Sequence, residues 1–195
     1  QNFPQRHMFP EAGLAPPTNR VPGTPGETAC LVIGGVEGYA DVHGARLQDV
    51  YIHGGPLYGL HLIDASNVLI TSCMIQFNRG KGVSIHSPDS GSSAITFIAG
   101  EIGQNGIVGL EAENVDNLLL MNVTIEGNMA GAGETEANGL IAIECNGVQL
   151  RGCHFEEATI GDDEDPVQAY QYALFDTCRG VVVESCTFQG GEDAE

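Results

Sequence analysis

The chain has 195 residues, which is enough for one domain with a hydrophobic core. Twenty-six acidic residues against seven lysines and arginines give a formal net charge of −19, so the surface repels nucleic acid and anionic membranes. No apolar run approaches the roughly 20 residues that a membrane-spanning helix needs, so we expect no membrane span.

The first 28 residues differ from the rest of the chain because they hold six of its nine prolines. Proline lacks a backbone N–H donor and fixes φ, which is incompatible with a helix interior or a central strand. We therefore expect an extended arm or linker over residues 1–28 and one folded domain over residues 29–195.

A phrase of about twenty residues recurs along the folded part of the chain. It reads "GLHLIDASNVLITSCMIQFN" from Gly59, "GLEAENVDNLLLMNVTIEGN" from Gly109 and "GLIAIECNGVQLRGCHFEEA" from Gly139. We take the first apolar residue of one strand in each repeat as its anchor, and the anchors are Val50, Val68, Ile95, Leu118, Val148 and Val181. A fixed phrase joined by loops of variable length is typical of a solenoid.

Within each phrase apolar and polar residues alternate, which is the period of a β-strand. Three alternating segments per repeat, separated by corners, predict three parallel sheets around one narrow core. The expected fold is all-β, a single-stranded right-handed parallel β-helix of about six turns, because parallel crossovers take the right hand. Like residues of successive turns then stack about 4.8 Å apart. In the first turn, an anchor at Val50 aligns Tyr51 with Leu69 of the next turn. The same alignment predicts that Gly55 and Leu57 point inward.

Two sets of residues stack into ladders under this alignment. The first set is Asn78, Asn105 and Asn128, each three residues after an inward apolar position; asparagine tolerates the left-handed backbone of a corner, and its amide can bond the next amide in a stack. The second set is cysteine, with one column of Cys73, Cys153 and Cys186 and another of Cys145 and Cys178.

The cysteines carry no C-x-x-C spacing, so a zinc site has little support. A bridge between neighbours in one column is conceivable, but parallel stacking points their side chains the same way, which is poor geometry for a disulfide. We interpret them as buried, reduced, small apolar side chains.

Several outward positions of the predicted sheets are apolar, and such a stripe marks a contact surface. We expect an interface between subunits there, and a covering by the N-terminal arm is the alternative. The predicted interface residues are Tyr51, Leu69, Ile98, Leu119, Met121 and Val182.

The repeated phrases, the asparagine ladder and the core pattern resemble the pectate-lyase-like superfamily of right-handed β-helices. That superfamily includes polysaccharide lyases, glycoside hydrolases, epimerases, adhesins and the trimeric tailspikes of phages. The resemblance implies the fold, and fold alone does not give function. The lyases hold Ca²⁺ with stacked aspartates beside a basic residue; here Asp64, Asn114 and Glu144 share a column that no Arg or Lys joins. The Gly-His-Gly motif of the hydrolases is also missing, because the chain has only His43-Gly44 and His53-Gly54.

These observations favour a non-catalytic structural or glycan-contacting module of an extracellular or virion spike or fibre, assembled as a homotrimer or a larger complex. The alternative is a polysaccharide lyase or glycoside hydrolase, whose candidate residues are Asp64, Glu144, Asp176, Arg151 and His154. A passive spacer within a longer chain is a third interpretation.

An acidic run at Asp162, Asp163 and Asp165 could supply oxygen ligands to Ca²⁺. It lacks the Asp-x-Asp-x-Asp-Gly loop of a dedicated calcium site, so a solvated loop is favoured and no cofactor is expected.

Overall fold

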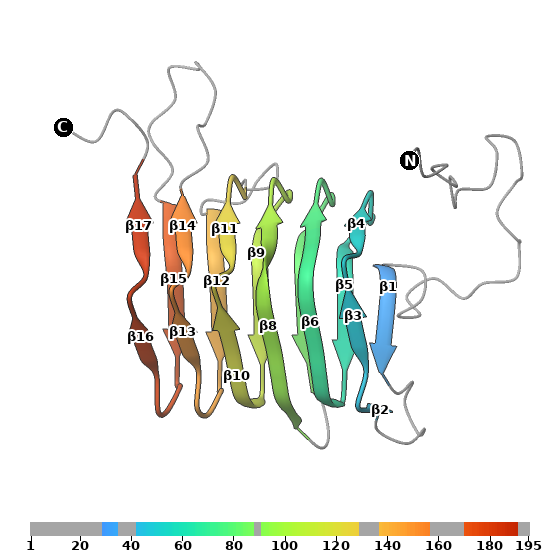
Figure 1. Ribbon diagram of the computed structural model, residues 1–195, viewed down its shortest axis with the longest axis horizontal. Helices are drawn as coiled ribbons and strands as arrows, with labels where there is room; N and C mark the ends of the chain where they lie inside the picture. The colour runs from blue at the N-terminus through green and yellow to red at the C-terminus, as the bar shows by residue number, and fades with distance from the viewer. Residues whose placement is uncertain (1–28, 35–41, 88–90, 129–136, 157–169, 191–195) are drawn as a thin grey trace, which may run out of the picture.

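The computed structural model describes residues 29–34, 42–87, 91–128, 137–156 and 170–190. These residues form parallel strands that wind into stacked coils, running from β1 at one end to β16 and β17 at the other (Figure 1). The described residues contain no helix. The protein is therefore an all-β parallel solenoid, as the repeat predicts.

One face of the solenoid is a six-stranded sheet in which each coil contributes one strand. Its order is β1 (Ala29–Gly34), β5 (Tyr58–Ile63), β7 (Lys81–His86), β9 (Val108–Glu113), β12 (Ala137–Ile143) and β15 (Tyr170–Asp176). Every neighbouring pair in this sheet is parallel.

The other two faces form one eleven-stranded sheet because two long strands, β6 (Ala65–Gln76) and β8 (Ser92–Gly103), run through both. The first face, here the β3–β16 ladder, adds β2 (Val42–His43), β3 (Arg46–Gln48), β10 (Val115–Met121), β13 (Gln149–Arg151) and β16 (Val182–Glu184). The second face, here the β4–β17 ladder, adds β4 (Tyr51–His53), β11 (Thr124–Glu126), β14 (His154–Glu156) and β17 (Thr187–Gln189).

The core is a set of vertical stacks of apolar side chains, since like residues of successive coils pair in register. In the β3–β16 ladder the buried stack is Ile70, Phe97, Leu120 and Leu150. In the β4–β17 ladder it is Ile75, Ile102, Ile125 and Phe155. Burial of these stacks is the main favourable contribution to folding, at about 25 cal/mol for each Å² of apolar surface removed from water.

The corner between the two ladders repeats one backbone conformation. The residue that enters it has positive φ in each of the described coils: Asp49, Ser72, Ala99, Asn122, Gly152 and Ser185. A left-handed residue bends the chain sharply while the pairing on each side continues. The corner therefore turns the strand direction without breaking the sheet.

The register corrects the predicted alignment of the first turn. Leu47, not Ile52, pairs with Ile70, and Tyr51 pairs with Met74. The anchor at Val50 is therefore wrong by five residues, because the true anchor is Ala45, whose methyl group gives a weak apolar signal.

The same shift moves the two positions that we predicted to point inward after Val50. Gly55 lies at the asparagine corner, where its N–H donates to Asn78 Oδ1 at 2.8 Å. Leu57 is 49% exposed instead of buried. The predicted arm over residues 1–28 and the acidic residues Asp162, Asp163 and Asp165 lie outside the described residues.

Candidate functional site

The outward side of the six-stranded sheet carries a group of polar and aromatic side chains across three neighbouring strands. Because side chains alternate along a strand, the burial of Leu60 and Leu62 in the core turns His61 and Ile63 outward. The register then places His61 beside Ser84, and Ser84 beside Glu111. We call this group the polar face; its residues are Tyr58, His61, Lys81, Ser84, His86, Glu111 and Glu113.

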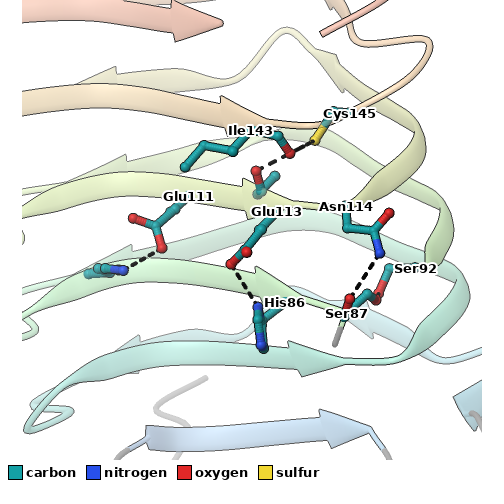
Figure 2. A network of polar contacts seen from close by, with 10 residues as sticks. His86, Ser87, Ser92, Glu111, Glu113, Asn114, Ile143 and Cys145 are labelled. Atoms are coloured by element: carbon teal, nitrogen blue, oxygen red, sulfur yellow. Dashed lines mark hydrogen bonds and ion pairs between the residues drawn. The ribbon is translucent and has the colours of Figure 1, made fainter. Parts of the chain in front are cut away.

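Two polar contacts join β7 to β9 on the polar face, a lysine–carboxylate ion pair and a histidine–carboxylate hydrogen bond (Figure 2). The Lys81 ammonium donates to the Glu111 carboxylate. His86 Nδ1 lies 2.8 Å from Glu113 Oε2. Each contact connects neighbouring coils, so the carboxylates of Glu111 and Glu113, two positions apart on β9, are held in place.

An aromatic contact extends the polar face to β5. The rings of Tyr58 and His61 have centroids 4.6 Å apart at an interplanar angle of 44°. Lys81 Nζ lies 6.0 Å from the centroid of the Tyr58 ring, within range of a cation–π interaction. The lysine therefore links the aromatic part of the face to its carboxylates.

His61 is the least expected member of this group, because it is only 9% exposed although it points away from the core. Burial, followed by the neighbouring His86 and Lys81, lowers the pKa of His61 to about 4. The imidazole is therefore neutral at physiological pH. Within the described residues its Nδ1 atom is buried without a hydrogen-bond partner.

A partly buried network of hydroxyl and amide groups fixes the corner where β7 ends. Asn114 Nδ2 donates to Ser87 O at 3.0 Å, and the Ser87 and Ser92 hydroxyls lie 2.6 Å apart (Figure 2). Ser92 Oγ in turn accepts the Ala65 N–H at 3.1 Å. These bonds hold the carboxyl end of the polar face in one arrangement.

A second group of acids lies on the outward side of the β4–β17 ladder. Its members, here the carboxylate column, are Glu126 and Glu156, which pair in register, and Glu101 of the preceding coil, which lies two positions earlier, opposite Thr124. Burial, and next the nearby Glu101, raise the pKa of Glu126. Gln76 Nε2 donates to Glu101 at one end, and His154 Nε2 lies 3.3 Å from Glu156 at the other.

The five candidate catalytic residues do not form one site in the structure. Asp64 and Glu144 occupy the same corner, but Ser87 and Asn114 of the intervening coils separate them. The Glu144 N–H donates to Asp176 O at 2.9 Å, so these two residues lie in neighbouring coils. Arg151 ends β13 and His154 begins β14, on the two other faces. Arg151 Nε lies 3.6 Å from Glu184 Oε2, and both side chains are about half exposed, so this pair contributes little to stability.

The predicted interface residues divide between two faces. Leu69, Leu119 and Val182 share one column of the β3–β16 ladder, and Ile98 and Met121 share the adjacent column. We call the four central residues, Leu69, Ile98, Leu119 and Met121, the apolar patch; they are half-buried and lie on β6, β8 and β10. Tyr51 lies on the other ladder, where it is 50% exposed and its ring centroid is 4.7 Å from that of His53.

The three asparagines form a continuous buried chain of amides. Asn78 Nδ2 donates to Asn105 Oδ1 at 2.8 Å, and Asn105 Nδ2 donates to Asn128 Oδ1 at 2.9 Å. The backbone N–H groups of Asn78 and Asn105 donate to the same two oxygens. The ladder thus satisfies the polar groups of a corner that has no access to water.

The cysteines in the described residues are free thiols. Burial raises the pKa of Cys145 to about 11 and raises that of Cys153 as well, so both are protonated at neutral pH. Their Sγ atoms donate to the backbone carbonyls of Ala112 and Leu120 in the preceding coil. Among the residues that the structure describes, no group of three or more His, Cys, Asp or Glu side chains is arranged to hold a metal ion.

The sequence did not predict the polar face as a site. The candidate residues chosen from the sequence lie mainly on the corners and on the other two faces. The signal in the sequence was a group of ionisable residues within three apolar strand segments: His61, Lys81, His86, Glu111 and Glu113. Strand β7, "KGVSIH", was not aligned with the corresponding strands of the other repeats. The segment between this strand and Ser92 is longer than in the other repeats, so the strand lies further from its anchor, Ile95.

The comparison with protein families agrees with the fold. The model of the family described as "Right handed beta helix region" matches residues 34–194, so the chain belongs to this family. The resemblance to the pectate-lyase-like superfamily is consistent with that match. Comparisons with curated proteins and with solved structures gave no significant match. Among the described residues there is no helix long and apolar enough to cross a membrane.

Proposed function

We propose that the chain is a non-catalytic, carbohydrate-contacting β-helix module of an extracellular or virion assembly of the spike or fibre type. The observation that supports this proposal best is the polar face. It combines an aromatic ring, two imidazoles, a lysine and two carboxylates on three neighbouring parallel strands.

The chemistry of the polar face suits a sugar chain. A pyranose ring offers hydroxyl groups that donate and accept hydrogen bonds, and C–H faces that pack on aromatic rings. Glu111 and Glu113 supply acceptors, and Tyr58 supplies an aromatic surface. Because the sheet fixes these groups before binding, little conformational entropy is lost when a ligand arrives.

The apolar patch supports the oligomeric part of the proposal. Outward apolar side chains on three adjacent strands mark a contact surface in a soluble protein. Association through one solenoid face around a threefold axis would cover the patch and leave the six-stranded sheet accessible. We propose a homotrimer on this basis.

A soluble polysaccharide panel, screened by affinity electrophoresis, tests carbohydrate contact. We expect retardation of the wild-type protein by at least one polysaccharide and a loss of retardation in the double variant Glu111→Gln, Glu113→Gln. Asp116→Asn is the matched control, because Asp116 is an exposed acid on β10 of another face. Binding that Asp116→Asn abolishes and the double variant keeps would place the contact away from the polar face.

A polysaccharide lyase or glycoside hydrolase is the second candidate function. The observation that favours it is the carboxylate column, where Glu126 with a raised pKa lies beside further carboxyl groups. Glycoside hydrolysis needs two carboxyl groups, one of them a proton donor. New reducing ends or unsaturated products, released from the same panel with and without Ca²⁺, would establish catalysis. Activity that persists in Glu101→Gln, Glu126→Gln and Glu156→Gln would then remove the carboxylate column from the mechanism. Activity that persists in Asp64→Asn, Glu144→Gln and Asp176→Asn would remove those three residues.

A further inference from the structure

The unpaired nitrogen of His61 is the feature of the polar face that the ion pairs and ring contacts leave unexplained. The side chain is nine-tenths buried, yet its Nδ1 atom has no partner in the described residues. Polar atoms of a folded core are almost always paired, so an unpaired one in a candidate site indicates a group that arrives with a ligand or with water. The low pKa of His61 keeps the ring neutral, and a neutral ring offers one acceptor and one donor.

The charges around His61 decide what kind of ligand can reach it. Each of the two basic neighbours already has an acidic partner, Lys81 with Glu111 and His86 with Glu113. Among the described residues of the polar face, no basic side chain is therefore left without an acidic partner to receive a uronate, sulfate or phosphate group. The formal net charge of −19 adds long-range repulsion of polyanions.

The neighbours of His61 on β5 are an aromatic ring and a buried apolar side chain. The Tyr58 ring packs against the imidazole, and Ile63, at 8% exposure, lies two residues further along β5. Lys81 lies over Tyr58 and ends in a rotatable ammonium group. A sugar whose C–H face packs on Tyr58 would bring its hydroxyl groups next to the imidazole, because the two rings are in contact.

We propose that His61 is a specificity-determining residue of the polar face, and that it selects an uncharged glycan by a hydrogen bond between its ring and a sugar hydroxyl. This inference rests on the proposed carbohydrate-contacting function. To that function it adds the class of ligand, an uncharged glycan, and the residue that recognises it.

Matched pairs of polysaccharides with one backbone and different charge test the inference. Hydroxyethyl cellulose is compared with carboxymethyl cellulose, and dextran with dextran sulfate, beside neutral galactomannan and arabinoxylan. We expect at least one neutral polymer to bind and every charged counterpart to bind at least tenfold more weakly. The ¹⁵N resonances of the His61 ring should shift when the neutral polymer is added.

Two variants of His61 and one control assign the effect to this residue. His61→Phe keeps the ring contact with Tyr58 but has no nitrogen, and we expect at least tenfold weaker binding. His61→Gln restores hydrogen-bonding groups and should recover part of the affinity. His43→Phe is the control, since His43 is exposed on β2 of the other sheet. Circular dichroism establishes that each variant is folded before its affinity is measured.

The outcomes separate this inference from the function on which it rests. In one outcome the protein binds carboxymethyl cellulose or dextran sulfate through Glu111 or Lys81, with an affinity that His61→Phe leaves unchanged. That result overturns the inference about His61, but it still supports carbohydrate contact at the polar face. Failure of every polymer in both classes overturns both.

Discussion

Replacement of Asn105 by alanine should destabilise the solenoid more than any comparable change at its surface. The Asn105 side chain is fully buried and joins three coils through its amide. Its Oδ1 accepts two hydrogen bonds, from Asn78 Nδ2 at 2.8 Å and from the Asn78 backbone N–H at 3.2 Å. Its Nδ2 also donates to Ile75 O at 3.1 Å. Asn105→Ala removes all of these side-chain hydrogen bonds at once.

The size of the effect follows from the groups left without partners. Asn78 is itself 2% exposed, so neither of its two donors can turn to water in the variant. A buried donor without a partner costs about 1–3 kcal/mol, so the two together cost about 2–6 kcal/mol. A domain of this size has about 5–15 kcal/mol of stability in total, and Asn105→Ala should remove a large part of it.

Urea denaturation followed by circular dichroism measures this loss as a change in the free energy of unfolding. Asn146→Ala is the matched control, because the Asn146 amide donates to Asp116 at 2.9 Å in an exposed position. We expect the control to change stability by less than about 0.5 kcal/mol. An Asn105→Ala protein as stable as this control would refute the view that the ladder satisfies buried polar groups.

Further predictions concern assembly and pH. Leu119→Asp on the apolar patch should leave the fold intact and reduce the mass in solution, measured by light scattering after size exclusion; normal assembly would remove the patch from the interface. Leu120→Asp buries an unpaired carboxylate in the core, at a cost of several kcal/mol, and should prevent folding as judged by circular dichroism. Glu126 has a raised pKa in the folded state, so the stability that its protonation gives is lost as pH rises through that pKa. Glu126→Gln should therefore raise Tm at pH 7.5 and lose this advantage toward pH 4, and an equal gain at both pH values would contradict the assignment.

The alternation of apolar and polar residues and the repeated segment were enough to predict the fold, because a solenoid stacks equivalent residues of successive coils on each other. The sequence could not fix the register where a coil lacks bulky apolar residues, as at Ala45. The polar face was missed for a related reason. A loop of different length before Ser92 hid β7, and without β7 the residues of β5 and β9 have no visible connection.

The neutral state of His61 could not be predicted from sequence at all. It depends on burial at an outward position and on the proximity of His86 and Lys81. Both are properties of neighbouring coils and not of the strand that carries the residue.

The asparagine ladder also sets the order in which parts of the molecule open. Each coil of a solenoid contacts only its neighbours, so its local stability follows from those two interfaces. Asn78, Asn105 and Asn128 join consecutive coils, whereas Val183 and Phe188 of the last described coil are each 45% exposed. Backbone amides of β8 and β11 should therefore exchange with deuterium slowest, and those of β16 and β17 fastest. Protection from exchange should then decrease, coil by coil, from the ladder towards β16 and β17.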